Sequence, residues 1–130
     1  MNGIFGIGTD IVEISRIKKI LNKNKKFKSR IFSIEEIKYC ESKKNKTAFY
    51  SKKFAAKEAF AKAIGTGFRN NLHFNDISVV NNKLGKPSFV ITDKLNKLIK
   101  TEFKTSSFNF FLSISDEKKY SIAFVILQKK

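Results

Sequence analysis

Two carboxylates stand out in this sequence because acidic residues are scarce and these two lie in apolar surroundings. The chain has 11 acidic residues against 27 basic ones. Asp10 follows the glycine-containing apolar segment 3–9 (GIFGIGT), and Glu58 lies within the alanine-rich segment 54–63 (FAAKEAFAKA). A Mg²⁺ ion that faces phosphates needs only one or two protein carboxylates, since substrate oxygens and water complete its octahedral shell. Asp10 and Glu58 are therefore candidate metal ligands.

The residues around these two acids fit phosphate chemistry, although spacing alone leaves another interpretation open. Lys57 and Lys62 flank Glu58 at distances that allow contact with phosphate oxygens, and glycines at 6 and 8 let the backbone approach a ligand closely. The alternative is that Asp10 is a turn residue or helix cap and that Glu58 belongs to a solvated face. The segment GIGTD is not a dinucleotide-binding fingerprint, because the third glycine and the strand–helix–strand context are missing.

Other catalytic arrangements find little support. Cys40 is the only cysteine and His73 the only histidine, which excludes an intramolecular disulfide, a thiolate cluster and a multi-histidine metal site. A Cys–His dyad is not expected, because Cys40 falls in a helical stretch and His73 in a polar loop.

The elements that must position these residues can be predicted from periodicity and caps. Residues 3–9 read as a strand that ends at Asp10, followed by a helix with apolar residues at 14, 17 and 21. Ser33 and Glu36 have capping-box spacing, which predicts a helix from there to about Lys43. The longest helix is predicted over 47–64 and ends at Gly65.

The second half of the chain alternates strands and one helix. Segments 77–80 and 89–91 predict a hairpin, and a short helix follows Thr92. Alternating apolar residues predict strands over 108–114 and 120–126, joined by a turn at 115–119. Because both faces of the last strand are apolar, we expect it to be buried on both sides. The predicted fold class is α+β, an antiparallel sheet packed on one long helix plus shorter helices.

Length and charge limit the remaining possibilities. The 130 residues predict one domain spanning 1–130. The apolar start is interrupted by Asp10 and Glu13, unlike a signal peptide, and no apolar run is long enough to span a bilayer, so we expect a cytoplasmic protein that binds no membrane. The formal charge of +16 favours anionic partners. A basic nucleic-acid-binding module is the main alternative, but most of the 14 phenylalanines lie at strand or helix spacings that bury them, so core packing explains them better than a stacking surface does.

The two acidic motifs together resemble those of the 4′-phosphopantetheinyl transferases, in particular the holo-acyl-carrier-protein synthases. Segment 6–17 (GIGTDIVEISRI) resembles the N-terminal motif of the family, and segment 54–67 (FAAKEAFAKAIGTG) resembles its second motif. Segments 84–87 (LGKP) and 112–115 (LSIS) fall where the family has similar stretches. The resemblance therefore covers almost the whole chain, in order.

The resemblance implies an activity and its participants. The expected reaction moves the 4′-phosphopantetheine arm of coenzyme A onto a serine of apo acyl carrier protein and releases 3′,5′-ADP. It is expected to require Mg²⁺ and to belong to fatty acid biosynthesis. Asp10 and Glu58 would hold the metal, Lys62 would lie near the reacting phosphate, and Asp10 is the candidate general base. A homotrimer with active sites between subunits is also implied. The residues expected around coenzyme A are Lys53, Lys57, Gly65, Gly85, Lys86 and Pro87.

Two further expectations concern the partner surface and a departure from the family. Arg16 and Lys19 lie one turn apart on the first helix, and we expect them to meet the acidic carrier protein. Histidines that commonly flank the LSIS stretch are replaced by Phe111 and Asp116, so no role of those histidines carries over. We expect Phe111 to be a core residue of its strand.

Overall fold

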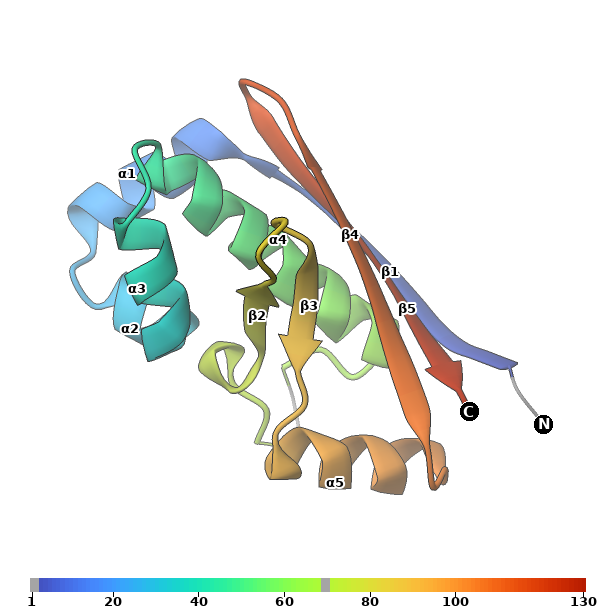
Figure 1. The fold of residues 1–130 in the computed structure, drawn as a ribbon. Coiled ribbons are helices and arrows are strands. Elements are labelled where there is room, and N and C mark those ends of the chain that lie inside the picture. The colour runs from blue at the N-terminus through green and yellow to red at the C-terminus, as the bar shows by residue number, and fades with distance from the viewer. Residues whose placement is uncertain (1–2, 69–70) are drawn as a thin grey trace.

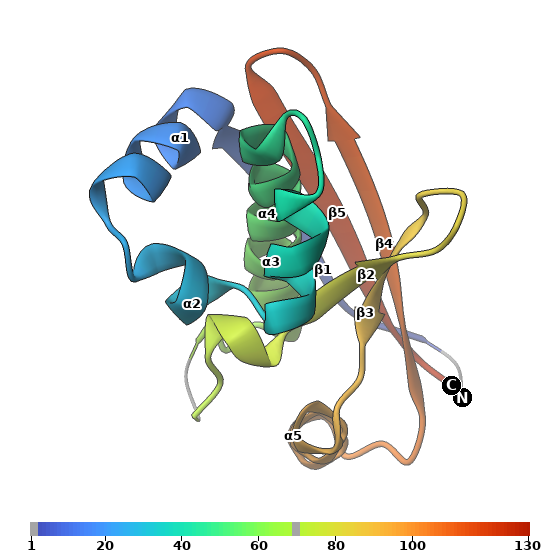
Figure 2. The same cartoon turned by 60° about the vertical axis from the view of Figure 1, so that its left-hand side comes forward.

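The computed structural model describes residues 3–68 and 71–130, in which a long sheet, a central helix and a set of smaller elements lie in layers (Figures 1 and 2). The elements follow in this order: β1 (Gly3–Glu13), α1 (Ile14–Lys23), α2 (Phe27–Ile31), α3 (Ile34–Glu41), α4 (Lys46–Ile64), the 3₁₀ turn η1 (Phe74–Asp76), β2 (Ser78–Asn81), β3 (Pro87–Val90), α5 (Asp93–Phe103), β4 (Phe108–Asp116) and β5 (Tyr120–Lys129).

The strands form two antiparallel sheets. The larger sheet has the order β1-β5-β4, with Asp10 opposite Ala123 and Glu13 opposite Tyr120. The smaller sheet is the hairpin β2–β3, in which Ser78 pairs with Val90. Helix α4 crosses one face of the larger sheet, while α1–α3 and the hairpin cover the other sides of that helix (Figure 2).

Helix α4 is the centre of the core and is buried on nearly every side. Its Asn45 cap accepts a hydrogen bond from the Ala48 N–H, and Gly65 ends it in the left-handed conformation, with φ of +78°. Aromatic rings fill the space around the helix, among them Phe60, which stacks on Phe110 at a centroid distance of 4.4 Å. A polar side chain of α4 that reaches solvent is therefore unusual, and its exposure calls for an explanation.

The α+β prediction is confirmed, as are the caps on which it depended. Ser33 and Glu36 form the predicted capping box at the start of α3, and Thr92 caps α5 by accepting from the Leu95 N–H. The hairpin is present, with strands one to two residues away from their predicted bounds. None of the helices in the described residues is long and apolar enough to cross a membrane.

Three local predictions were wrong. Strand β1 continues past Asp10 to Glu13, because Ile11 and Val12 go on pairing with β5, and the final turn is confined to residues 117–119. The last strand is buried on one side only: Ala123 is fully buried, whereas Phe124 is 42% exposed. Phe111 is likewise not a core residue, since it is 51% exposed on the same outer face of the sheet.

Candidate active site

The site begins where β1 packs directly on the backbone of α4. Gly6 and Gly8 face the helix so closely that an added Cβ would lie 1.7 Å from the Ala63 carbonyl oxygen and 1.8 Å from that of Ala59, respectively. Only glycine allows this approach, which explains the glycines of the first motif better than contact with a ligand does. Side chains on this face of β1, including Asp10, are thereby brought against α4.

Asp10, Glu58 and Lys62 come together at this contact. The Lys62 ammonium lies 3.2 Å from Asp10 Oδ1 and donates a 3.0 Å hydrogen bond to the Thr9 carbonyl oxygen. The Asp10 side chain is 16% exposed and that of Lys62 is 56% exposed. Burial and then the nearby Asp10 carboxylate raise the pKa of Glu58, against the opposing effect of Lys62 and Arg16. The two acids predicted from the motifs are thus electrostatic neighbours.

This pair of acids fits a divalent cation that also binds phosphate. Among the described residues the Glu58 carboxylate has neither a hydrogen bond nor an ion pair, and no cluster of three or more histidine, cysteine or acidic side chains could hold a metal by itself. Two neighbouring negative charges are stabilised by a cation between them. The donor set of Asp10 and Glu58 therefore suits Mg²⁺ that takes its other ligands from substrate and water.

A hollow of about 340 Å³ opens beside Glu58, and we call it the carboxylate hollow; Asp10 does not line it. It contains two residues of the predicted site besides Glu58, namely Lys62 and Gly65. The left-handed Gly65 ends α4 at the rim of this hollow and so lets the chain turn away from it. Its lining residues are Glu58, Ala61, Lys62, Gly65, Gly67 and Phe68.

A second hollow, of about 330 Å³, lies between α3, α4, the hairpin and β4, and we call it the lysine hollow. It brings together Lys53, Gly85 and Pro87 from the predicted cofactor set, whereas Lys86 is exposed nearby and does not line it. Lys43 and Lys52 join them, so the lining is strongly basic. Such a surface attracts phosphate groups. The full lining is Tyr39, Lys43, Phe49, Lys52, Lys53, Val79, Asn81, Gly85, Pro87, Ile114 and Asp116.

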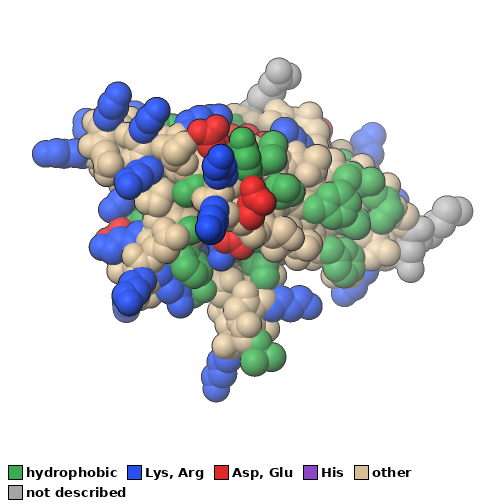
Figure 3. All heavy atoms as spheres, turned by 90° about the horizontal axis from the view of Figure 1, so that it is seen from above, with side chains coloured by type: hydrophobic (Ala, Val, Ile, Leu, Met, Phe, Trp, Pro, Cys, Tyr) green, Lys and Arg blue, Asp and Glu red, His purple; other side chains and the backbone are tan. Residues whose placement is uncertain are grey.

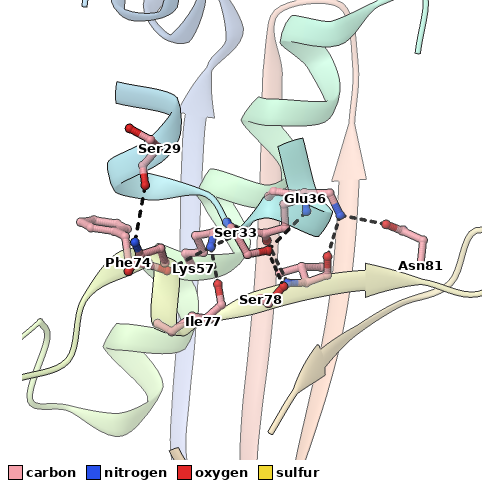
Figure 4. Close-up of polar contacts among 11 residues, drawn as sticks. Ser29, Ser33, Glu36, Lys57, Phe74, Ile77, Ser78 and Asn81 are labelled. Atoms are coloured by element: carbon pink, nitrogen blue, oxygen red, sulfur yellow. Dashed lines mark hydrogen bonds and ion pairs between the residues drawn. The ribbon is translucent and has the colours of Figure 1, made fainter. Parts of the chain in front are cut away.

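Lys57 does not lie where the resemblance suggested, and its expected contact with coenzyme A is corrected. The side chain is fully buried and pairs with Glu36 at 2.6 Å (Figure 4). Its ammonium also donates to the carbonyl oxygens of Phe74 and Ile77. The Lys57 ammonium already has three partners and the side chain has no exposed surface, so Lys57 cannot contact a ligand. It stabilises the fold around the site instead.

Several residues of the lysine hollow were missed by the sequence analysis. Lys43, Lys52 and Asn81 carry no local motif, and only the fold brings them beside Gly85. Asp116, which replaces a family histidine, also lines this hollow and lies 3.5 Å from the Lys52 ammonium. The hairpin predicted from segments 77–80 and 89–91 implied a turn between them, but the sequence did not show which surface this turn faces.

The outer face of the large sheet is an exposed apolar surface, which Figure 3 shows as green side chains toward the sheet end of the molecule. Blue lysine and arginine side chains crowd the opposite end, around α1–α3 (Figure 3), where Arg16 and Lys19 are both exposed. Phe111 and Phe124 lie on the apolar face among isoleucines, not among lysines, which removes support from the nucleic-acid alternative. The residues of this outer face that are at least 42% exposed are Ile4, Ile7, Ile11, Phe111, Ile122 and Phe124.

Comparison with known proteins agrees with the geometry. A family model described as the 4′-phosphopantetheinyl transferase superfamily matches residues 6–125. The holo-[acyl-carrier-protein] synthase of Pelagibacter ubique (strain HTCC1062) is 68% identical over 127 residues, covering 98% of both chains. A crystal structure of the Bacillus anthracis holo-(acyl-carrier-protein) synthase in complex with CoA (3′,5′-ADP) has a TM-score of 0.80 at 36% identity, covering 98% of each chain. The Neisseria meningitidis holo-[acyl-carrier-protein] synthase gives a TM-score of 0.84 at 39% identity, covering 96% of this chain and 98% of its own.

Proposed function

Because the chain belongs to the 4′-phosphopantetheinyl transferase superfamily, where it groups with the holo-[acyl-carrier-protein] synthases, we propose the following reaction. The enzyme transfers the 4′-phosphopantetheine of coenzyme A to a serine of apo acyl carrier protein, requires Mg²⁺ and releases 3′,5′-ADP. The observation that carries this proposal is the neighbouring pair Asp10 and Glu58, which joins the two family motifs across β1 and α4. The proposed unit is a single domain, and the family model extends over most of it.

The proposed mechanism gives Asp10, Glu58 and Lys62 separate tasks. Asp10 and Glu58 would hold Mg²⁺, which would neutralise negative charge on the diphosphate of coenzyme A. The Lys62 ammonium, exposed and 3.2 Å from Asp10, adds positive charge beside the reacting phosphate.

The bond changes follow from this arrangement. The serine oxygen bonds to the phosphorus that carries pantetheine, the bond from that phosphorus to the bridging oxygen breaks, and 3′,5′-ADP leaves with the electron pair. Asp10 is the proposed acceptor of the serine proton, because its carboxylate lies 3.2 Å from the Lys62 ammonium that is assigned to the reacting phosphate.

The lysine hollow supplies the proposed site for the nucleotide end of coenzyme A. Lys43, Lys52 and Lys53 line it and match the negative charge of a phosphorylated adenosine. The solved relative from Bacillus anthracis, which binds CoA (3′,5′-ADP), supports a nucleotide ligand for this fold.

Two observations support a homotrimer with active sites between subunits. The carboxylate hollow and the lysine hollow have no lining residue in common, which allows the two ends of coenzyme A to be bound by different chains. The outer apolar face of the sheet is also too extensive for a solvent-facing surface and suits contact with another subunit. A mass near 45 kDa by light scattering is expected, about three times the 14.9 kDa chain.

Mixing inactive subunits tests whether a site is shared. Asp10→Asn removes a proposed metal ligand at the contact of β1 with α4 and Lys43→Glu reverses a charge in the lysine hollow, so each variant alone should be inactive. If sites lie between subunits, equal mixtures that are allowed to exchange should regain roughly a quarter of the wild-type sites. A mixture as inactive as its components would mean that both hollows of one site belong to the same chain.

The reaction itself is tested by mass spectrometry of apo acyl carrier protein incubated with the enzyme, coenzyme A and Mg²⁺. A gain of the phosphopantetheine mass on one serine is expected with the wild-type enzyme. Asp10→Asn and Glu58→Gln should remain folded but lose most Mg²⁺-dependent transfer, whereas Glu35→Gln, on an exposed residue of α3, serves as the control. Near-normal turnover in both of the first two variants would refute the metal assignment.

A further inference from the structure

A buried polar cluster joins helices α3 and α4 to the hairpin β2–β3 (Figure 4). Its centre is the ion pair of Glu36 and Lys57, at 2.6 Å with both side chains fully buried. Glu36 also accepts hydrogen bonds from the N–H groups of Ser33, at 2.9 Å, and Val79, at 2.8 Å. A buried ion pair is tolerated only when its remaining bonding capacity is satisfied, as it is here. The pair therefore fixes strand β2 against both helices.

Lys53 extends this cluster toward the lysine hollow. It lies four residues before Lys57 on α4, hence on the same side of the helix. Its ammonium donates to the Val79 carbonyl oxygen at 2.8 Å and to Asn81 Oδ1 at 2.9 Å. Val79 is consequently held at both of its backbone groups, its N–H by Glu36 and its carbonyl oxygen by Lys53.

Asn81 links Lys53 to the turn between β2 and β3 through hydrogen bonds of its side chain. Its Nδ2 donates a 3.0 Å hydrogen bond to the Gly85 carbonyl oxygen, while its Oδ1 is engaged by Lys53. Gly85 has φ of +89°, a conformation that favours glycine, so the turn has a defined shape that must be held. Asn81, Gly85 and Pro87 all line the lysine hollow.

We propose that Glu36, Lys53 and Asn81 are positioning residues that hold the turn 82–86 in the shape that binds the nucleotide end of coenzyme A. The inference rests on the proposed function. A turn that is already ordered before binding loses less conformational entropy when the ligand arrives, so affinity for the nucleotide rises without a new contact. The chain of contacts starts in the core at Glu36 and ends at the rim of the hollow with Asn81.

The competing explanation is that the cluster only stabilises the fold. Asn81 separates the two explanations because it lies at the outer end of the cluster and is partly exposed. Its replacement should leave the buried Glu36–Lys57 pair intact and loosen only the turn. A residue with a purely structural role would change the melting temperature but not the affinity for one substrate relative to the other.

The experiment compares Asn81→Ala with Asn96→Ala, a substitution on α5 at an asparagine whose side chain makes no hydrogen bond within the described residues. Hydrogen exchange at residues 82–86 should speed up in Asn81→Ala alone. The KM for coenzyme A and the Kd for 3′,5′-ADP, measured by calorimetry without carrier protein, should each rise roughly tenfold because two hydrogen bonds are lost. Neither kcat nor the KM for the carrier protein should change.

Asn81→Asp provides a second variant. It keeps the acceptor for Lys53, loses the donor to Gly85 and adds a negative charge to the lining of the hollow, so its effect on 3′,5′-ADP affinity should be at least as large as that of Asn81→Ala. Folded Asn81 variants with wild-type exchange in the turn and wild-type nucleotide affinity would overturn the inference while leaving the transfer activity established. A wild-type protein that neither binds 3′,5′-ADP nor modifies the carrier would overturn the proposed function as well.

Discussion

Replacement of Gly8 by alanine tests whether the close packing of β1 on α4 builds the active site. A Cβ at this position would lie 1.8 Å from the Ala59 carbonyl oxygen and 2.8 Å from the Ala63 backbone nitrogen. Both neighbours are backbone atoms inside a helix, so neither can rotate away as a flexible side chain would. The strand itself has to move.

The size of the displacement follows from these distances. Ordinary van der Waals contact begins near 3.4 Å, so β1 must withdraw from α4 by roughly 1.6 Å at this point. Overpacking of this kind costs about 1–3 kcal/mol, and the melting temperature should fall by roughly 5–15 °C. Asp10 lies two residues further along the same face of β1, and a shift of about 1 Å in a reacting group lowers turnover by about 100-fold.

The assay combines thermal melting with initial rates of holo-carrier formation at saturating coenzyme A. Gly3→Ala is the matched control, because it lies on the same strand and an added Cβ there meets nothing within 4 Å. We expect Gly3→Ala to stay within about 0.5 kcal/mol of the wild type with unchanged turnover. A folded Gly8→Ala enzyme with wild-type melting temperature and turnover would falsify the packing argument. A destabilised variant with normal kcat would retain the packing argument but separate it from catalysis.

Three further predictions concern the core, the acid limit and the carrier surface. Glu36→Gln should cost about 3–5 kcal/mol in chemical denaturation, because it leaves the Lys57 ammonium buried without a counter-charge. Glu36→Gln combined with Lys57→Met removes that ammonium and keeps an acceptor for the Val79 N–H, so it should cost less than the sum of the two single substitutions; additive losses would contradict this. Hydrogen bonds from two lysines and a tyrosine lower the pKa of Glu41 from 4.5 to about 2, so the stability it supplies is present above pH 4.5 and is lost as the pH falls toward 2. Melting curves of Glu41→Gln should accordingly depend less on pH in that window, and an unchanged dependence would show that other groups set the acid limit. Replacing both Arg16 and Lys19 by Glu should raise the KM for the acidic carrier protein more than the KM for coenzyme A. The increase in KM for the carrier protein should become smaller as salt is added, because salt screens the charges. Loss of coenzyme A affinity alone would instead assign this helix to the cofactor site.

Local signals in the sequence were sufficient for most elements. Ser33, Gly65 and Thr92 mark helix ends through bonds to neighbouring residues, and such short-range chemistry can be read from spacing. The faces of the sheet were harder. Alternation in β5 shows two apolar faces, but it cannot show that α4 covers the one with Ala123 and leaves Phe124 exposed. For the same reason Phe111 was wrongly assigned to the core.

Asp10 lies beside Lys62 and Glu58, the other acidic and basic residues singled out from the motifs, but it is not the end of its strand. Its proposed role depends on the residue type and on the motif, both visible in the sequence. The extent of β1 depends on pairing with β5, which lies more than 100 residues later in the chain. The pairing of Glu36 with Lys57 could not be predicted for a similar reason, because it joins two different helices. The capping box at the start of α3 was also a sufficient local explanation for a glutamate at position 36.

The lysines of the second motif show how far helical periodicity alone could have gone. Lys53 and Lys57 are four residues apart and share one side of α4, and Glu58 and Lys62 are four apart and share another, about 100° away. The structure agrees with this division: the first pair faces β2, and the second faces β1. Periodicity therefore predicts that these residues serve two different surroundings. It cannot predict that Lys57 is buried while Lys53 lines the lysine hollow. That difference depends on where α3 and the hairpin pack against α4. Residue type and spacing thus identify the groups that can do the chemistry, and tertiary packing decides which of them can touch a substrate.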